Sequence, residues 1–147
     1  MGGIIDAHSR IGAGRPEETR TPDEALRQMD AAGIAVAWVC PTDACVAVRN
    51  EEGNAAIAAI VRAHPDRFVG CAVANPWWGE RAVEMVARAF GDGLRVLFLH
   101  PPLQAINFTP DRTSICSPSK HVLSLLGCDD FWSQLTADEF RVAIFLF

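Results

Sequence analysis

Short apolar runs alternate with longer amphipathic segments from the start of the chain to about Leu103. The apolar runs are nearly continuous, which is typical of strands buried on both faces of a parallel sheet. The predicted strands are Ile4–Ala7, Ile34–Cys40, Phe68–Val73 and Leu94–Leu99. The predicted helices are Pro22–Ala32, Glu51–His64 and Gly79–Phe90.

Capping signals support these helices. Thr21 suits the N-cap, Pro22 the first helical position, and Glu24 completes a capping box. Gly33 is expected to end the first helix and Pro65 the second. Because a helix follows each strand, the order predicts a parallel sheet with right-handed crossovers. Functional groups should then gather at the carboxyl ends of the strands, in a barrel or in an open doubly wound sheet.

The segments outside this pattern have a different character. Ser9–Arg20 and Pro41–Asn50 are polar enough to predict loops, and Asp43 in the second loop is a positional candidate for the site. Beyond Pro110, the stretch Arg112–Lys120 is rich in Ser, Thr and Pro and predicts a loop or disorder. Residues 142–147 form an apolar, strand-like run that only a sheet or a partner would cover.

The composition narrows the class of protein. With 147 residues, 50% hydrophobic and 21% charged, the chain should form a globular α/β domain with a sizeable core. A net charge of −5 argues against nucleic acid or an anionic membrane as a partner. No signal peptide or membrane span is recognisable, so we expect a cytoplasmic protein with reduced thiols, Cys40 and Cys71 being core residues.

Several short motifs occur in the order and spacing of a known family. They are Asp6-x-His8 after an apolar run, the helix start at residues 21–24, Asn50-Glu51, residues 63–70 and residues 93–104. Together they resemble the amidohydrolase-related family, in the branch that includes aminocarboxymuconate-semialdehyde decarboxylase-like enzymes. The resemblance covers roughly residues 3–110. We therefore divide the chain into a partial barrel, 1–110, and an atypical tail, 111–147, whose composition would fit a chimeric, out-of-frame or partly disordered segment.

The resemblance implies an N-terminal portion of a TIM (β/α)₈ barrel. The portion would be incomplete, because a whole barrel takes about 250 residues. Family members hydrolyse or decarboxylate small organic substrates with a divalent metal, usually zinc, at the mouth of the barrel. The metal is held by an H-x-H pair on strand 1, a histidine on a middle strand and an aspartate on strand 8. Residues i and i+2 of a strand point to one side, and His8 matches the first ligand.

The chain departs from this pattern at several positions. Arg10 stands at the second histidine, and a guanidinium has no lone pair to offer a metal. Phe98 stands where the family often has lysine, and His121 lies in a Ser- and Pro-rich stretch that gives no match to the middle-strand histidine. The aspartate of strand 8 has no counterpart. We therefore expect a truncated and impaired relative with doubtful metal occupancy.

Each candidate residue has a functional and a structural interpretation. His8 is a metal ligand or a buried histidine at a strand end, and Arg10 binds a substrate carboxylate or is solvated. His100 is a ligand or proton shuttle, or a turn residue ahead of two prolines. Trp77 and Trp78 form an aromatic wall for the substrate, or they pack the rim or an oligomer contact.

Three functions remain open on the sequence alone. The first is a metal-dependent hydrolase or decarboxylase acting on a small carboxylic substrate. The second is a non-catalytic half-barrel that self-associates, because open sheet edges invite pairing. The third is a binding module for small organic acids that needs no metal and uses Arg10, Trp77 and Trp78.

Overall fold

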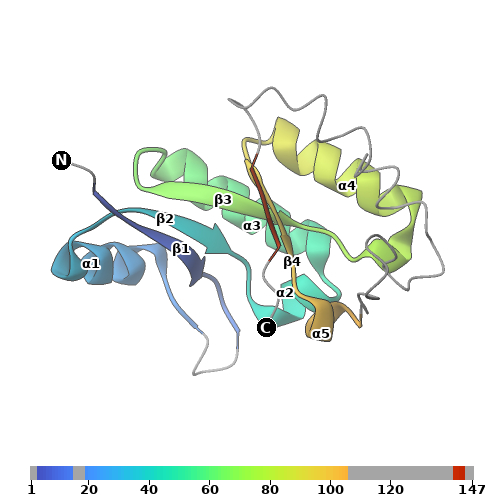
Figure 1. Cartoon of the computed structure of the whole chain (residues 1–147), viewed down its shortest axis with the longest axis horizontal. Helices are drawn as coiled ribbons and strands as arrows, with labels where there is room; N and C mark the ends of the chain where they lie inside the picture. Colours follow the sequence, from blue (N-terminus) through green and yellow to red (C-terminus); the bar gives the residue numbers. More distant parts are fainter. Residues whose placement is uncertain (1–2, 15–18, 106–140, 145–147) are drawn as a thin grey trace.

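A five-stranded parallel sheet, with its strands ordered in space as in the sequence, organises the computed structural model (Figure 1). The structure describes residues 3–14, 19–105 and 141–144. The strands are β1 (Ile4–Arg10), β2 (Ile34–Cys40), β3 (Phe68–Val73), β4 (Val96–Leu99) and β5 (Arg141–Ile144). This strand order is that of a sheet curling into part of a barrel.

The helices follow the strands as the alternation predicts. They are α1 (Pro22–Ala32), α2 (Asp43–Ala47), α3 (Asn50–Ala63), η1 (Pro76–Trp78), α4 (Glu80–Gly91) and α5 (Pro101–Gln104). The Thr21 hydroxyl accepts a hydrogen bond from the Glu24 N–H at 3.2 Å, so the predicted cap of α1 is confirmed. Among the described residues, no helix has the length and apolar character needed to cross a membrane.

Two predicted loops are shorter than expected. β1 continues to Arg10 because Ser9 and Arg10 pair with Val39 and Cys40 of β2, so the prediction of a loop from Ser9 was wrong there. The loop predicted at Pro41–Asn50 contains α2. The Asn50 side chain stabilises that helix, since its amide donates to two carbonyls at the end of α2 at 2.8 and 2.9 Å.

The far part of the chain contributes one described strand. β5 runs parallel to β4 and pairs with all four of its residues, in the region where the sequence shows an apolar run. The predictions for residues 112–140, and for His121 in particular, lie outside the described residues.

At the other edge of the sheet, β1 leaves Ile4 60% and Ile5 58% exposed. Self-association through such an edge stays a prediction.

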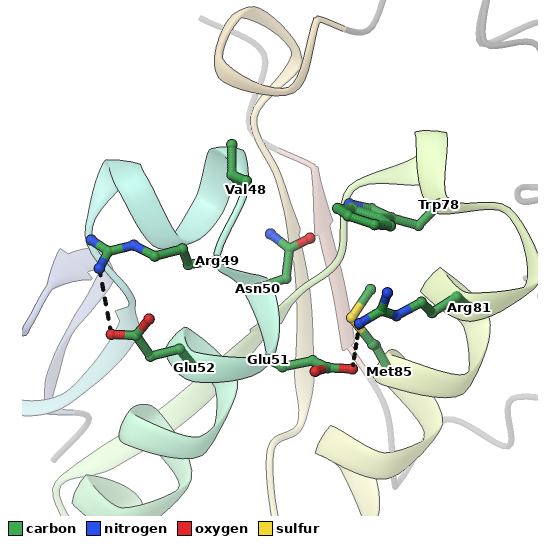
Figure 2. A pocket seen from close by; sticks show the side chains of 8 residues that line it. All are labelled: Val48, Arg49, Asn50, Glu51, Glu52, Trp78, Arg81 and Met85. Carbon is green, nitrogen blue, oxygen red and sulfur yellow. Dashed lines mark hydrogen bonds and ion pairs between the residues drawn. The ribbon is translucent and has the colours of Figure 1, made fainter.

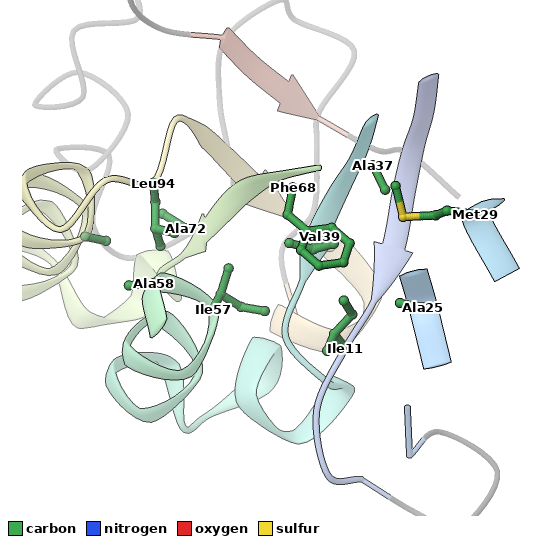
Figure 3. Packing of buried hydrophobic residues seen from close by; sticks show 11 residues of the cluster. Ile11, Ala25, Met29, Ala37, Val39, Ile57, Ala58, Phe68, Ala72 and Leu94 are labelled. Carbon is green, nitrogen blue, oxygen red and sulfur yellow. The ribbon is translucent and has the colours of Figure 1, made fainter. Parts of the chain in front are cut away.

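β2, β3 and β4 are apolar throughout because both faces of this part of the sheet carry a core. The outer core lies between the sheet and the helices and includes Val39, Phe68 and Ile57 (Figure 3). The inner core lies on the opposite face and consists of Cys40, Val46, Cys71, Val73, Val96 and Phe98. Cys40 and Cys71 are completely buried, in agreement with their prediction as core residues.

A buried asparagine fixes α3 to the sheet. The Asn54 side chain donates to the Val73 carbonyl and accepts from the Val73 N–H, both at 2.8 Å. These two bonds satisfy the N–H and the carbonyl of Val73, the last residue of β3. Asn54 is only 7% exposed, so water could not easily take over these two hydrogen bonds if the side chain were removed.

We expect Asn54→Leu to lower the free energy of unfolding by about 3 kcal/mol, because it leaves a buried N–H and a buried carbonyl unpaired. Urea denaturation followed by tryptophan fluorescence measures the change. Ala59→Leu, at an exposed position of the same helix, is the matched control and should have little effect. Equal stability of the Asn54 variant and the wild type would contradict this role.

Candidate functional site

The carboxyl ends of β1, β2 and β4, with the segments that follow them, form one edge of the sheet, which we call the mouth. A hollow of about 490 Å³ lies there. This mouth hollow is lined by Ala13, Gly14, Asp43, Ala44, Ala47, Arg49 and Leu103. Most of these side chains are small and apolar, and two carry charge. The lining therefore suits a small organic molecule with an apolar body and a charged group.

An ion pair crosses the mouth from β1 to α2. The guanidinium of Arg10, the last residue of β1, pairs through Nη1 with the carboxylate of Asp43, the first residue of α2. The two side chains are only 24% and 35% exposed. A partly buried guanidinium needs such a partner, because removing its charge from water is costly. Arg10 is thus held in place beside the mouth hollow.

His100 follows β4 directly and begins α5. Its Nδ1 accepts a hydrogen bond from the Leu103 N–H at 3.3 Å, and its backbone N–H donates to Oε1 of Gln104 at 2.8 Å. Burial lowers the pKa of His100, and the positive charge of Arg10 lowers it further. The ring is therefore a neutral imidazole close to a permanent cation.

His8 lies deeper, on the inner face of the sheet. The pairing of β1 with β2 is irregular between Asp6 and Ser9, and the Asp6 carboxylate accepts from the His8 N–H at 3.0 Å. The His8 ring stacks on Phe98 with centroids 5.3 Å apart and planes 13° from parallel. Hydrogen bonding to Cys71 and burial raise the pKa of the neighbouring Cys40 thiol, and His8 opposes this shift. Cys40 is therefore an unreactive core thiol.

The described residues do not fit the metal that the family resemblance implies. Within residues 3–14, 19–105 and 141–144, no group of three or more His, Cys, Asp or Glu side chains could hold a metal ion. A catalytic zinc usually has three protein ligands. Arg10 supplies a cation at the second ligand position and is already paired with Asp43. Zinc therefore stays a prediction from the resemblance, and no chemical step is derived through it.

The two tryptophans of η1 have different surroundings. The Trp77 indole N–H donates to the carbonyls of Gln104 and Ala105 at 3.0 and 3.3 Å, which ties η1 to the end of α5. Trp78 lines a separate hollow of about 230 Å³ between α3 and α4, where the Arg81 guanidinium lies 5.0 Å from its ring centroid (Figure 2). Among the described residues, neither tryptophan lines the mouth hollow.

Amide side chains, none of which the sequence analysis identified as a site residue, connect the segments of the mouth. The Asn75 N–H donates to Oδ1 of Asn50 at 2.8 Å, which links the segment after β3 to α3. Nε2 of Gln104 donates to the Ala74 carbonyl at 3.0 Å, which links α5 to the same segment. The sequence signal for these residues was an uncharged amide side chain close to the end of an apolar strand. The signal was not sufficient, because the hydrogen-bond partners are distant in the sequence.

Among the comparisons with known proteins, the one with solved structures supports this fold. No family model and no curated relative matches the sequence. A dihydroxybenzoic acid decarboxylase from Polaromonas sp. JS666, solved with bound manganese and the inhibitor 2-nitroresorcinol, matches with a TM-score of 0.55 and 21% identity, over 68% of this chain and 39% of that one. A 2,6-dihydroxybenzoate decarboxylase complexed with 2,6-dihydroxybenzoate matches with a TM-score of 0.53 and 21% identity, over 68% and 40%.

This likeness concerns the fold. The chain spans about two fifths of the length of these two structures. The predicted fold, the N-terminal portion of a TIM barrel with parallel strands alternating with helices, is confirmed.

Proposed function

We propose that this chain belongs to the amidohydrolase superfamily and that its mouth binds a small organic carboxylic acid. The order of the sequence motifs, the barrel fold and the dihydroxybenzoates named for similar structures support the superfamily and the class of ligand. The proposal includes the reaction, which would be decarboxylation or hydrolysis of that acid, as in other members of the superfamily.

One observation carries the proposal: Arg10 is paired with Asp43, and Asp43 also lines the mouth hollow, whose other lining side chains are mainly small and apolar. A guanidinium has five N–H donors and can hold a carboxylate in a fork. Asp43 pairs with Nη1 and orients the guanidinium, so its other N–H donors remain for a ligand. The alanines and glycine of the mouth hollow then leave room for the apolar body of the acid.

Metal-dependent catalysis is the second candidate. His8 in the Asp6-x-His8 motif and the manganese bound in a similar structure favour it. A divalent metal at the mouth would polarise a substrate oxygen or activate water. The described residues supply no complete ligand set, so carboxylate binding rather than metal chemistry is the primary proposal.

Benzoate is a simple probe of the mouth, since it combines a carboxylate with an apolar ring. We expect Arg10→Met to weaken benzoate binding by about tenfold or more, because a charge-assisted hydrogen bond contributes roughly 1.5–3 kcal/mol. Asp43→Asn should strengthen binding, because it removes a negative charge that repels the carboxylate, while the amide oxygen can still accept a hydrogen bond from Arg10. Isothermal titration calorimetry measures both changes.

Arg88→Met is the matched control for this experiment. Arg88 is a 67% exposed cation on α4, away from the mouth, so its loss should leave benzoate affinity unchanged. Equal affinities for the wild type and Arg10→Met would place the ligand elsewhere. Failure of benzoate and related acids to bind the wild type at all would remove the proposal.

Metal content separates the two candidates. We expect the purified chain to contain far less than one equivalent of zinc or manganese, and His8→Ala to leave that amount unchanged, because the described residues offer no three-ligand group. Plasma mass spectrometry of both proteins measures this. Near-stoichiometric metal that disappears in His8→Ala would favour the metal-dependent enzyme instead.

The pKa of His100 tests the electrostatics of the mouth. Burial and Arg10 lower it from its ordinary value of 6.5, so the unfolded chain binds the proton more readily than the folded one. The contribution of His100 to stability is therefore complete above about pH 6.5 and is lost as the pH falls toward the folded-state pKa. Arg10→Met should raise that pKa, which NMR titration of the imidazole measures. An unchanged pKa would show that the two groups do not interact.

A further inference from the structure

We propose that Arg49 is a second anion-binding residue of the mouth, beside Arg10, and that a carboxylate entering the mouth hollow draws Arg49 away from Glu52. The inference rests on the proposed function, because it concerns the same acid in the same hollow. It adds a cation that lines the hollow directly, and it gives Glu52 a role in setting the affinity.

Arg49 lies on the wall between two hollows. It lines the mouth hollow, and it also lines the hollow of about 230 Å³ between α3 and α4. In Figure 2 its guanidinium points away from Trp78, which lies across the α3–α4 hollow. The other charged residue that lines the mouth hollow is Asp43, which is already paired with Arg10. Arg49 is therefore the cation that a ligand in the mouth hollow meets directly.

The backbone at Arg49 is fixed by the joint between α2 and α3. Its N–H donates to the Ala44 carbonyl at 3.1 Å, and its carbonyl accepts from the Gly53 N–H at 3.0 Å. Gly53 lets the first turn of α3 lie against α2, since a Cβ at this residue would come within 2.7 Å of the Cβ of Cys45. The side chain of Asn50, which is 1% exposed, closes the joint by donating to two carbonyls of α2. The guanidinium of Arg49 thus extends from a fixed backbone position.

The guanidinium itself is held only weakly. Its Nη1 lies 3.6 Å from Oε1 of Glu52, three residues further along the chain, and the two side chains are 54% and 65% exposed. A separation of this length is an ion pair without a well-formed hydrogen bond. Because an exposed ion pair contributes little free energy, exchanging Glu52 for another carboxylate costs little.

A carboxylate in the mouth hollow can interact with Arg49 better than Glu52 does. A free ligand can approach the planar guanidinium in a fork, with two parallel N–H···O bonds. Its apolar body would lie against Ala44, Ala47 and Leu103, which line the same hollow. Such a body excludes water from the hollow and so strengthens the attraction between the two charges. The ligand therefore has an advantage over Glu52.

The neighbouring Glu51 offers an internal comparison. Its Oε1 lies 3.5 Å from Nη2 of Arg81 and 3.9 Å from Nη1 of Arg88, both on α4. Glu51 and Glu52 both line the α3–α4 hollow and not the mouth hollow, and both are at least half exposed. Two adjacent carboxylates of α3 thus pair with different cations, and within the described residues Glu52 is the one that pairs with Arg49.

Calorimetric titration with benzoate tests the exchange. We expect Arg49→Met to weaken binding by about fivefold, because it removes a half-exposed cation from the hollow. Glu52→Gln should strengthen binding by about threefold, because Arg49 then has no charged partner to leave. The double variant with both substitutions should bind as weakly as Arg49→Met alone, because Glu52 acts on the ligand through Arg49.

Glu51→Gln is the matched control. It removes the same charge from the adjacent residue of α3, and it should leave the benzoate affinity unchanged because Glu51 pairs with Arg81 and Arg88. All of these variants should keep the wild-type melting temperature, since the ion pairs involved are exposed. Equal gains in Glu51→Gln and Glu52→Gln would indicate general charge repulsion and overturn the role of Glu52.

The outcomes also separate this inference from the proposed function. Unchanged affinity in Arg49→Met, together with weaker binding in Arg10→Met, would overturn the inference and leave the carboxylate site standing. A gain from Glu52→Gln that persists when Arg49 is also replaced would overturn the exchange. If the wild type binds no benzoate, both the carboxylate site and the exchange fail.

Discussion

The mouth depends on buried amide side chains that take the place of sheet hydrogen bonds where the strands end. A parallel strand leaves backbone groups unpaired at its carboxyl end, and burying them unpaired would cost free energy. Asn54 satisfies both groups of Val73, and Gln104 satisfies the Ala74 carbonyl. Asn50 does the same for the end of α2. These bonds hold the segments after β2, β3 and β4 at fixed positions.

The polar and charged groups of the mouth come from the strand ends that this framework holds. Arg10 comes from β1, Asp43 from the start of α2 and His100 from the start of α5. Their ion pair and electrostatic interaction join segments far apart in the sequence. An exposed ion pair would contribute little. Here the two side chains are only 24% and 35% exposed, so their interaction is screened less by water.

The strands and long helices could be predicted because their signals are local. A continuous apolar run predicts a strand buried on both faces, and Thr21 with Pro22 predicts the start of α1. The errors came where contacts outside the local apolar pattern decide the structure. β1 extends to Arg10 because β2 lies beside it, and α2 forms with Asn50 beneath its last carbonyls. The Arg10 and Asp43 pair was beyond prediction for the same reason, although both residues had been named separately.

The departures from the family motif agree with one another physically. Where the resemblance implies a histidine ligand there is Arg10, and where it implies a lysine there is Phe98, which stacks on His8. A guanidinium and a divalent metal both attract a carboxylate, but only the metal needs ligands with free lone pairs. With Arg10 at the mouth, a stacked His8 and a His100 whose Nδ1 caps a helix are therefore consistent with binding an acid through hydrogen bonds and charge.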